Sequence, residues 1–128
     1  MMRQQPDPYL VQQVTTASKA MLTSMLFNAA VANAQRAIEH LDETRPQQAR
    51  RFLIKSQEIV LELRTSLDHE AGGEIAGNLE RIYDYVYRQL LAASVHGDAA
   101  AARDAHRILA DLRDTWQLAC VDSLVATP

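Results

Sequence analysis

The fold of this chain is decided by residues 66–90, SLDHEAGGEIAGNLERIYDYVYRQL, where a glycine pair separates two helical patterns. Three of the four tyrosines of the chain follow within five residues, at Tyr83, Tyr85 and Tyr87. Alternating aromatic residues are typical of a strand, but the apolar residues around them recur at the spacing of a helix. With about 100° per residue, Tyr83 and Tyr87 fall on one edge of the apolar stripe and Tyr85 on the other. The stripe itself, predicted to be buried, consists of Ile75, Leu79, Ile82, Val86, Leu90 and Ala93.

The same helical period recurs along the chain, and most glycine and proline residues fall between the periodic segments. Short connections make successive helices antiparallel neighbours. The sequence therefore predicts one all-α domain, an antiparallel up-down four-helix bundle with a short, partly mobile N-terminal arm. The predicted arm covers about residues 1–17, and the predicted helices cover about 18–43, 45–70, 74–96 and 98–123.

Residues suited to helix ends lie at these boundaries. Ser18, Thr44 and Asp98 are the predicted N-caps, because their side-chain oxygens accept hydrogen bonds from free backbone N–H groups. Gly72 is the predicted C-terminal cap of the second helix, in the left-handed conformation that glycine adopts without strain.

The amino-acid composition argues against a nucleic-acid-binding protein, a membrane-spanning protein and a disulfide-bonded protein. The 13 basic and 16 acidic residues are interleaved, with a net charge of −3, so the chain lacks the basic stripe of a nucleic-acid-binding protein. No apolar run reaches the roughly 18 residues that cross a bilayer, and the N-terminus lacks the apolar core of a signal peptide. The single cysteine, Cys120, excludes an internal disulfide. We therefore expect a cytoplasmic protein without membrane insertion.

Catalytic, metal-binding and cofactor-binding patterns are missing from the sequence. No histidine has a glutamate three residues before it, as a di-iron bundle requires, and the glycines of GGEIAG do not match a dinucleotide loop. We therefore predict no enzyme activity, no metal and no cofactor. His106, flanked by Arg103 and Arg107 in mid-helix, keeps open a phosphotransfer or signalling module, which would need this histidine exposed. A second alternative is a self-associating bundle with an apolar dimer interface.

Four stretches, taken together, resemble the FliS-type family of flagellin-specific export chaperones. They are VTTASKAMLTSML (14–26), KSQEIVLELRTSLD (55–68), GGEIAGNLERIYDYVYRQLLAAS (72–94) and LADLRDTW (109–116). Tyr9 stands where the family has a tyrosine in its N-terminal arm. Two departures are visible: Lys19 replaces a frequent proline, and FNAAV (27–31) replaces a tyrosine-aspartate-glycine run.

The resemblance implies a small cytoplasmic chaperone with an antiparallel helical-bundle fold. Such a chaperone binds the disordered C-terminal segment of flagellin, prevents premature polymerisation and aids delivery to the flagellar export apparatus. The implied partners are flagellin and components of the export gate. Independently of the resemblance, an apolar dimer interface would make a second copy of the free protein a further partner. The N-terminal arm resembles the family segment that covers part of the binding surface when flagellin is absent.

The residues expected to contact flagellin combine the tyrosine pattern with this resemblance. Tyrosines at the edge of a bundle often have a buried ring and a solvated hydroxyl, so a packing role for them stays open beside the binding role. The predicted contact residues are Tyr9, Leu10, Val14, Leu67, Asn78, Tyr83, Tyr85, Tyr87 and Trp116.

Overall fold

The computed structural model describes the backbone of residues 7–125 and the side chains of residues 7–10 and 18–120. All secondary-structure elements of the described residues are helices, which confirms the all-α class. It consists of α1 (Pro8–Asp42), α2 (Pro46–Thr65), α3 (His69–His96) and α4 (Ala99–Val125). α3 is interrupted at Gly73, which has a φ of 50° and a ψ of −121°, so the described chain contains five helical segments rather than four.

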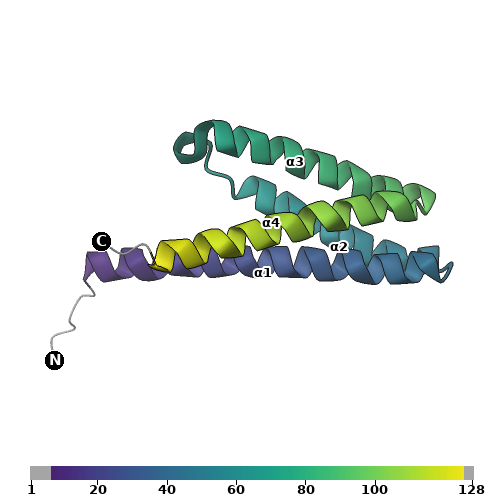
Figure 1. The fold of residues 1–128 in the computed structure, drawn as a ribbon, viewed down its shortest axis with the longest axis horizontal. Helices are drawn as coiled ribbons and strands as arrows, with labels where there is room; N and C mark the ends of the chain where they lie inside the picture. Colours follow the sequence, from purple (N-terminus) through teal and green to yellow (C-terminus); the bar gives the residue numbers. More distant parts are fainter. Residues whose placement is uncertain (1–6, 126–128) are drawn as a thin grey trace, which may run out of the picture.

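The helices alternate in direction, and each packs against the next, while α4 returns to pack against α1 (Figure 1). Near the α1–α2 and α3–α4 connections the four helices lie close together (Figure 1). Toward the α2–α3 connection, α3 diverges from α1 and α4 (Figure 1). We call the first region the closed end and the region around residues 66–68 the open end.

The core is built mainly from aliphatic side chains and alanine. The alanines of α1 that contact neighbouring helices, including Ala30, Ala34 and Ala37, are fully buried. Ser56 of α2 is also fully buried, and its hydroxyl donates a hydrogen bond of 3.0 Å to the Ala30 carbonyl. Because these residues are small, the backbones of α1 and α2 approach closely enough for this contact.

α1 begins much earlier than predicted, so the prediction of an N-terminal arm up to residue 17 is wrong from residue 8 onward. Asp7 accepts a hydrogen bond of 3.0 Å from the Tyr9 backbone N–H, and Pro8 occupies the first turn, where proline is well tolerated. Ser18 lies inside the helix. Apolar periodicity marks burial rather than helicity, and α1, with 35 residues, extends past the end of the 20-residue α2.

The boundary between α2 and α3 also differs from the prediction. α2 ends at Thr65, and Asp68 caps a new helical turn by accepting a hydrogen bond of 3.0 Å from the Ala71 backbone N–H. Gly73, not Gly72, has the positive φ. A Cβ on Gly72 would lie 2.8 Å from the Cβ of Ala76, so Gly72 is needed for close packing and not for capping.

Of the two remaining predicted N-caps, Asp98 caps α4 and Thr44 does not cap α2. Asp98 accepts a hydrogen bond of 3.1 Å from the Ala101 backbone N–H, as predicted for an N-cap. Gly97, with a φ of 64°, ends α3 in the left-handed conformation. Thr44 is not the N-cap of α2: it lies in the connection with a φ of 58°, and Arg45 precedes the helix without a side-chain cap.

Candidate partner-binding site at the open end

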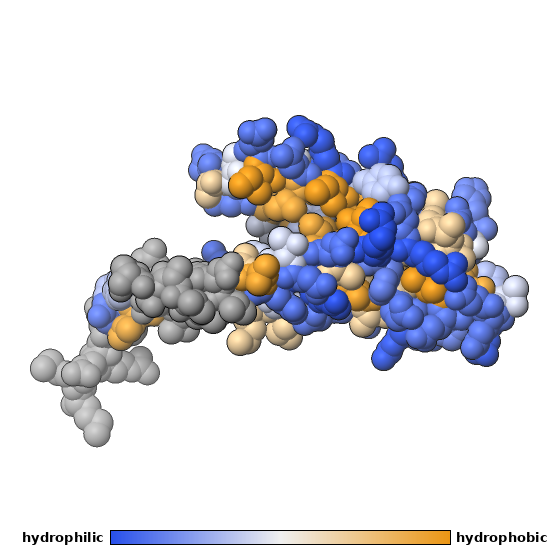
Figure 2. Space-filling model, in the orientation of Figure 1, coloured by the Kyte–Doolittle hydropathy of each residue, from blue (hydrophilic) through white to orange (hydrophobic). Residues whose placement is uncertain are grey.

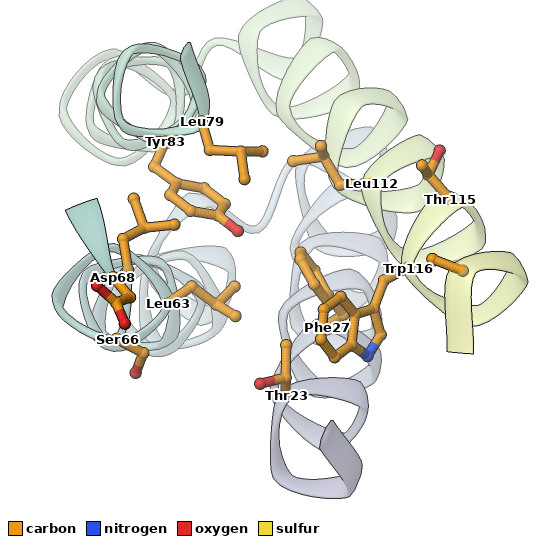
Figure 3. A pocket seen from close by; sticks show the side chains of 12 residues that line it. Thr23, Phe27, Leu63, Ser66, Asp68, Leu79, Tyr83, Leu112, Thr115 and Trp116 are labelled. Atoms are coloured by element: carbon orange, nitrogen blue, oxygen red, sulfur yellow. The ribbon is translucent and has the colours of Figure 1, made fainter. Parts of the chain in front are cut away.

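A pocket of about 300 Å³ lies at the open end, with walls from all four helices (Figure 3). Its apolar walls come mainly from Phe27 of α1, Leu63 of α2, Leu79 of α3, and Leu112 and Trp116 of α4. The lining is completed by Thr23, Ser66, Leu67, Asp68, Tyr83, Thr115 and Ala119. The divergence of α3 from α1 and α4 creates this space, because the side chains of the four helices do not meet here.

Trp116 is held in a defined orientation on the α4 wall. Its indole N–H donates a hydrogen bond of 2.9 Å to the Ser24 hydroxyl of α1. Its ring packs against Phe27, with 6.4 Å between ring centroids and 43° between the planes. The tryptophan therefore joins α4 to α1 and presents part of a rigid aromatic surface to the pocket.

Tyr83 enters the pocket from α3, and its hydroxyl points toward the space between α3 and α4 (Figure 3). The side chain is only 3% exposed, and burial raises the pKa of Tyr83 to about 12. The hydroxyl is therefore neutral at physiological pH and available as a hydrogen-bond donor. The prediction placed this ring at the edge of the apolar stripe, whereas the structure places it in the core.

Large apolar side chains are exposed near the same end. Ile75 is 71% exposed, so its predicted burial is wrong: α3 diverges here, and no helix covers this face. Met21, Leu22 and Met25 of α1 are also more than half exposed. Figure 2 shows apolar surface along the first part of α3 and in the angle between α3 and α4. Apolar surface of this kind is typical of a protein–protein interaction site.

The family comparison identifies the chain. The sequence profile described as "Flagellar protein FliS" matches residues 1–123. The chain belongs to the flagellar protein FliS family. The predicted family resemblance is thereby confirmed.

Several relatives of this FliS-family protein are named flagellar secretion chaperones. The chain is 36% identical over 108 residues to "Flagellar secretion chaperone FliS" of Salmonella typhimurium, which covers 81% of this chain and 78% of that protein. It is 30% identical over 117 residues to the FliS chaperone of Escherichia coli, covering 90% and 86% respectively. It is 29% identical over 116 residues to the FliS chaperone of Bacillus subtilis, covering 88% of this chain and 86% of that protein. These relatives are named as chaperones and not as enzymes.

Three of the residues predicted to contact flagellin in this FliS-family protein line the pocket, namely Leu67, Tyr83 and Trp116. Tyr9 and Leu10 lie on the N-terminal part of α1 and are 66% and 56% exposed. Tyr9 precedes Phe27 by 18 residues, or about five turns, so it lies on the same face of α1 as the pocket. The side chain of Val14 lies outside the described residues.

The other predicted contact residues lie outside the pocket. Tyr85, 44% exposed, donates a hydrogen bond of 2.5 Å to Asp104 of α4, which raises the pKa of Tyr85. Hydrogen bonds from Tyr85, Arg107 and Gln89 lower the pKa of the Asp104 carboxyl. Tyr85 thus links α3 to α4. Tyr87 is half-buried against the core, and Asn78 is exposed and accepts a hydrogen bond of 2.8 Å from Arg81.

An ion-pair network at the open end, which includes Glu80 and Asp84 of α3, was not predicted from the sequence. Arg64 of α2 lies 3.0 Å from Glu80 and 2.8 Å from Asp84 of α3, and His69 lies 3.4 Å from Glu80. This network spans the α2–α3 connection. Its signal in the sequence was the placement of opposite charges on either side of the predicted turn.

The residues considered for metal binding or phosphotransfer do not form a second site among the described residues. Among the described residues, no three histidine, cysteine, aspartate or glutamate side chains are grouped to hold a metal ion. His106 is partly buried, and its pKa is lowered by burial and by the nearby Arg113. A phosphotransfer histidine needs to be exposed, so this position does not favour that alternative. Within the described part of the chain, no helix is long and apolar enough to cross a membrane.

Proposed function

We propose that this FliS-family protein is a cytoplasmic flagellar secretion chaperone that binds the disordered C-terminal segment of flagellin. Binding would prevent premature polymerisation and aid delivery of flagellin to the export apparatus. The observation that carries the proposal is the apolar pocket at the open end, together with exposed apolar side chains such as Ile75 and Met25 on the helices that form it. The chaperone names of the relatives from Salmonella and Escherichia support it.

In this proposal, the long helices form an antiparallel up-down bundle whose surface suits an amphipathic segment. Grooves between neighbouring helices accept the apolar face of such a segment, and a pocket fixes its register through one anchor side chain. Ordering the segment costs about 1–2 kcal/mol per residue in backbone entropy, which apolar burial at about 25 cal/mol per Å² must offset. The mechanism therefore uses binding energy alone and involves no reaction chemistry.

We assign flagellin contacts to three surfaces. The pocket contributes Leu67, Tyr83 and Trp116. The N-terminal part of α1 contributes Tyr9, Leu10 and Val14, and the outer faces of α3 contribute Asn78, Tyr85 and Tyr87. The export gate components and a self-dimer of the free protein are further proposed partners, and exposed apolar residues such as Leu22 and Met25 provide surface for them.

The test is calorimetric titration of the purified protein with a peptide of the last ~40 residues of flagellin from the same organism, a length that buries the area typical of coupled folding. We expect a one-to-one complex with a large negative heat-capacity change, because apolar surface is buried. A peptide of the same composition in scrambled order is the control. Absence of binding at micromolar concentrations, with the helical circular dichroism intact, would contradict the proposed function.

A further inference from the structure

The polar groups in the pocket wall differ in whether they already have a hydrogen-bond partner. The hydroxyls of Thr23, Ser66 and Thr115 donate to the carbonyls one turn earlier in the chain, at 3.0, 2.8 and 2.9 Å. The Asp68 carboxylate accepts from the Ala71 backbone N–H, and the Trp116 indole N–H is bonded to Ser24. These groups are therefore satisfied within the protein.

Tyr83 is the exception. Its side chain is 97% buried, and its hydroxyl makes no hydrogen bond to any residue that the structure describes. The hydroxyl points into the pocket (Figure 3). Because the hydroxyl borders the pocket, a group that enters the pocket can accept a hydrogen bond from it. Tyr83 thus provides the free donor inside an otherwise apolar pocket.

The size of the pocket limits what enters it. Its volume of about 300 Å³ is at the lower end of the roughly 300–1,000 Å³ of pockets that hold small ligands. This is room for one large apolar side chain and the backbone next to it. A helix that lies over the mouth of the pocket or ends there can place such a group inside.

We propose that the pocket receives the point at which a helix of the bound client segment ends. In this arrangement one apolar side chain of the client packs against Phe27 and Trp116, and the Tyr83 hydroxyl donates to a main-chain carbonyl next to it. The last four carbonyls of a helix lack intrahelical partners, whereas those in the middle are already bonded. The inference rests on the proposed function and adds to it a defined subsite with a specificity-determining hydrogen bond.

Tryptophan fluorescence can report whether the pocket is occupied, because Trp116 is the single tryptophan of the chain and lines the pocket. The experiment titrates the full-length protein with the flagellin peptide, with any peptide tryptophan replaced by phenylalanine. Heat and Trp116 fluorescence are recorded in parallel. For the wild type we expect both signals to change with the same midpoint.

Three variants test the subsite. Tyr83→Phe removes the donor and leaves the ring, so we expect affinity to fall roughly three- to tenfold while the fluorescence change persists. Ala119→Leu narrows the pocket from α4, and we expect it to abolish the fluorescence change and weaken binding at least tenfold. Thr65→Val is the matched control: it removes a hydroxyl that bonds the Leu61 carbonyl outside the pocket, so we expect an unchanged affinity.

The outcomes separate the two proposals. If the wild type gives no heat of binding, the proposed function itself fails. If the peptide binds but Trp116 fluorescence is constant and Ala119→Leu binds normally, the pocket is not the subsite, and only the further inference is overturned. If Tyr83→Phe has an unchanged melting temperature and binds the peptide as tightly as the wild type, then Tyr83 does not donate the proposed hydrogen bond to the client.

Discussion

The closed and open ends of the bundle differ in the size of the side chains between the helices. At the closed end, alanines from all four helices are almost fully buried, namely Ala34, Ala37, Ala49, Ala93, Ala102 and Ala105. At the open end, Phe27, Leu63, Leu79 and Trp116 stand between the helices and leave a pocket. Small residues let helix axes approach closely, whereas large residues hold them apart. The same four helices are therefore a stable core at one end and a candidate binding site at the other.

The largest expected effect compares two leucines of α3. Leu90 is fully buried toward the closed end, and Leu90→Ala should reduce the free energy of unfolding by about 2–5 kcal/mol, because it leaves a cavity in a packed core. Leu79→Ala should cost clearly less, since Leu79 already borders the pocket. Urea denaturation of both variants measures the difference. Equal losses would show that the two ends are packed alike.

A second comparison adds volume at the two ends of α4. Ala102 is fully buried at the closed end, so Ala102→Leu should destabilise the protein by about 1–3 kcal/mol through overpacking. Ala119→Leu extends into the pocket and should change stability by no more than about 0.5 kcal/mol, the usual range for a substitution away from the packed core. Thermal denaturation followed by circular dichroism checks both. A large loss for Ala119→Leu would mean that the pocket has no spare room.

A third comparison concerns two glycines near the start of α3. Gly73 has a positive φ, where an L-residue is strained, so Gly73→Ala should cost about 1–2 kcal/mol. Gly77 lies within the helix with free space around its Cα, so Gly77→Ala should stabilise by about 0.5–1 kcal/mol. The two variants carry the same chemical change in one helix. A stabilising Gly73→Ala would show that the interruption of α3 is not a rigid feature of the open end.

The last comparison concerns the pH dependence of stability at the open end, which is confined to alkaline pH and absent at neutral pH. Burial raises the pKa of Tyr83 to about 12, above the value near 10 of an unfolded tyrosine. Between these values the folded state binds the proton that the unfolded state has released, so this group stabilises the fold below pH 10 and loses that contribution as pH rises toward 12. Urea denaturation at pH 9 and 11.5 should therefore show a smaller alkaline loss for Tyr83→Phe than for the wild type. Identical losses would place the hydroxyl in solvent.

Much of the local structure was predictable from the sequence. Helical period and the placement of glycine and proline predicted the all-α class, and Asp98 acts as the predicted cap because capping depends on neighbouring atoms alone. The helical wheel placed Tyr85 on the opposite side of α3 from Tyr83, and Tyr85 does contact α4. The motifs around Gly73 and Tyr83 predicted the family that the profile match confirms.

The relative placement of the helices was decided only by the tertiary structure. Helical period could not show that α1 begins at Pro8, because the N-terminal turns extend past α2. Nor could it show that Ile75 is exposed, because Ile75 belongs to the apolar stripe but α3 diverges where it lies. The pocket joins Phe27, Leu63, Tyr83 and Trp116 from four separate helices. A sequence pattern specifies which face of a helix is apolar, but the distance between two such faces depends on packing along the entire bundle.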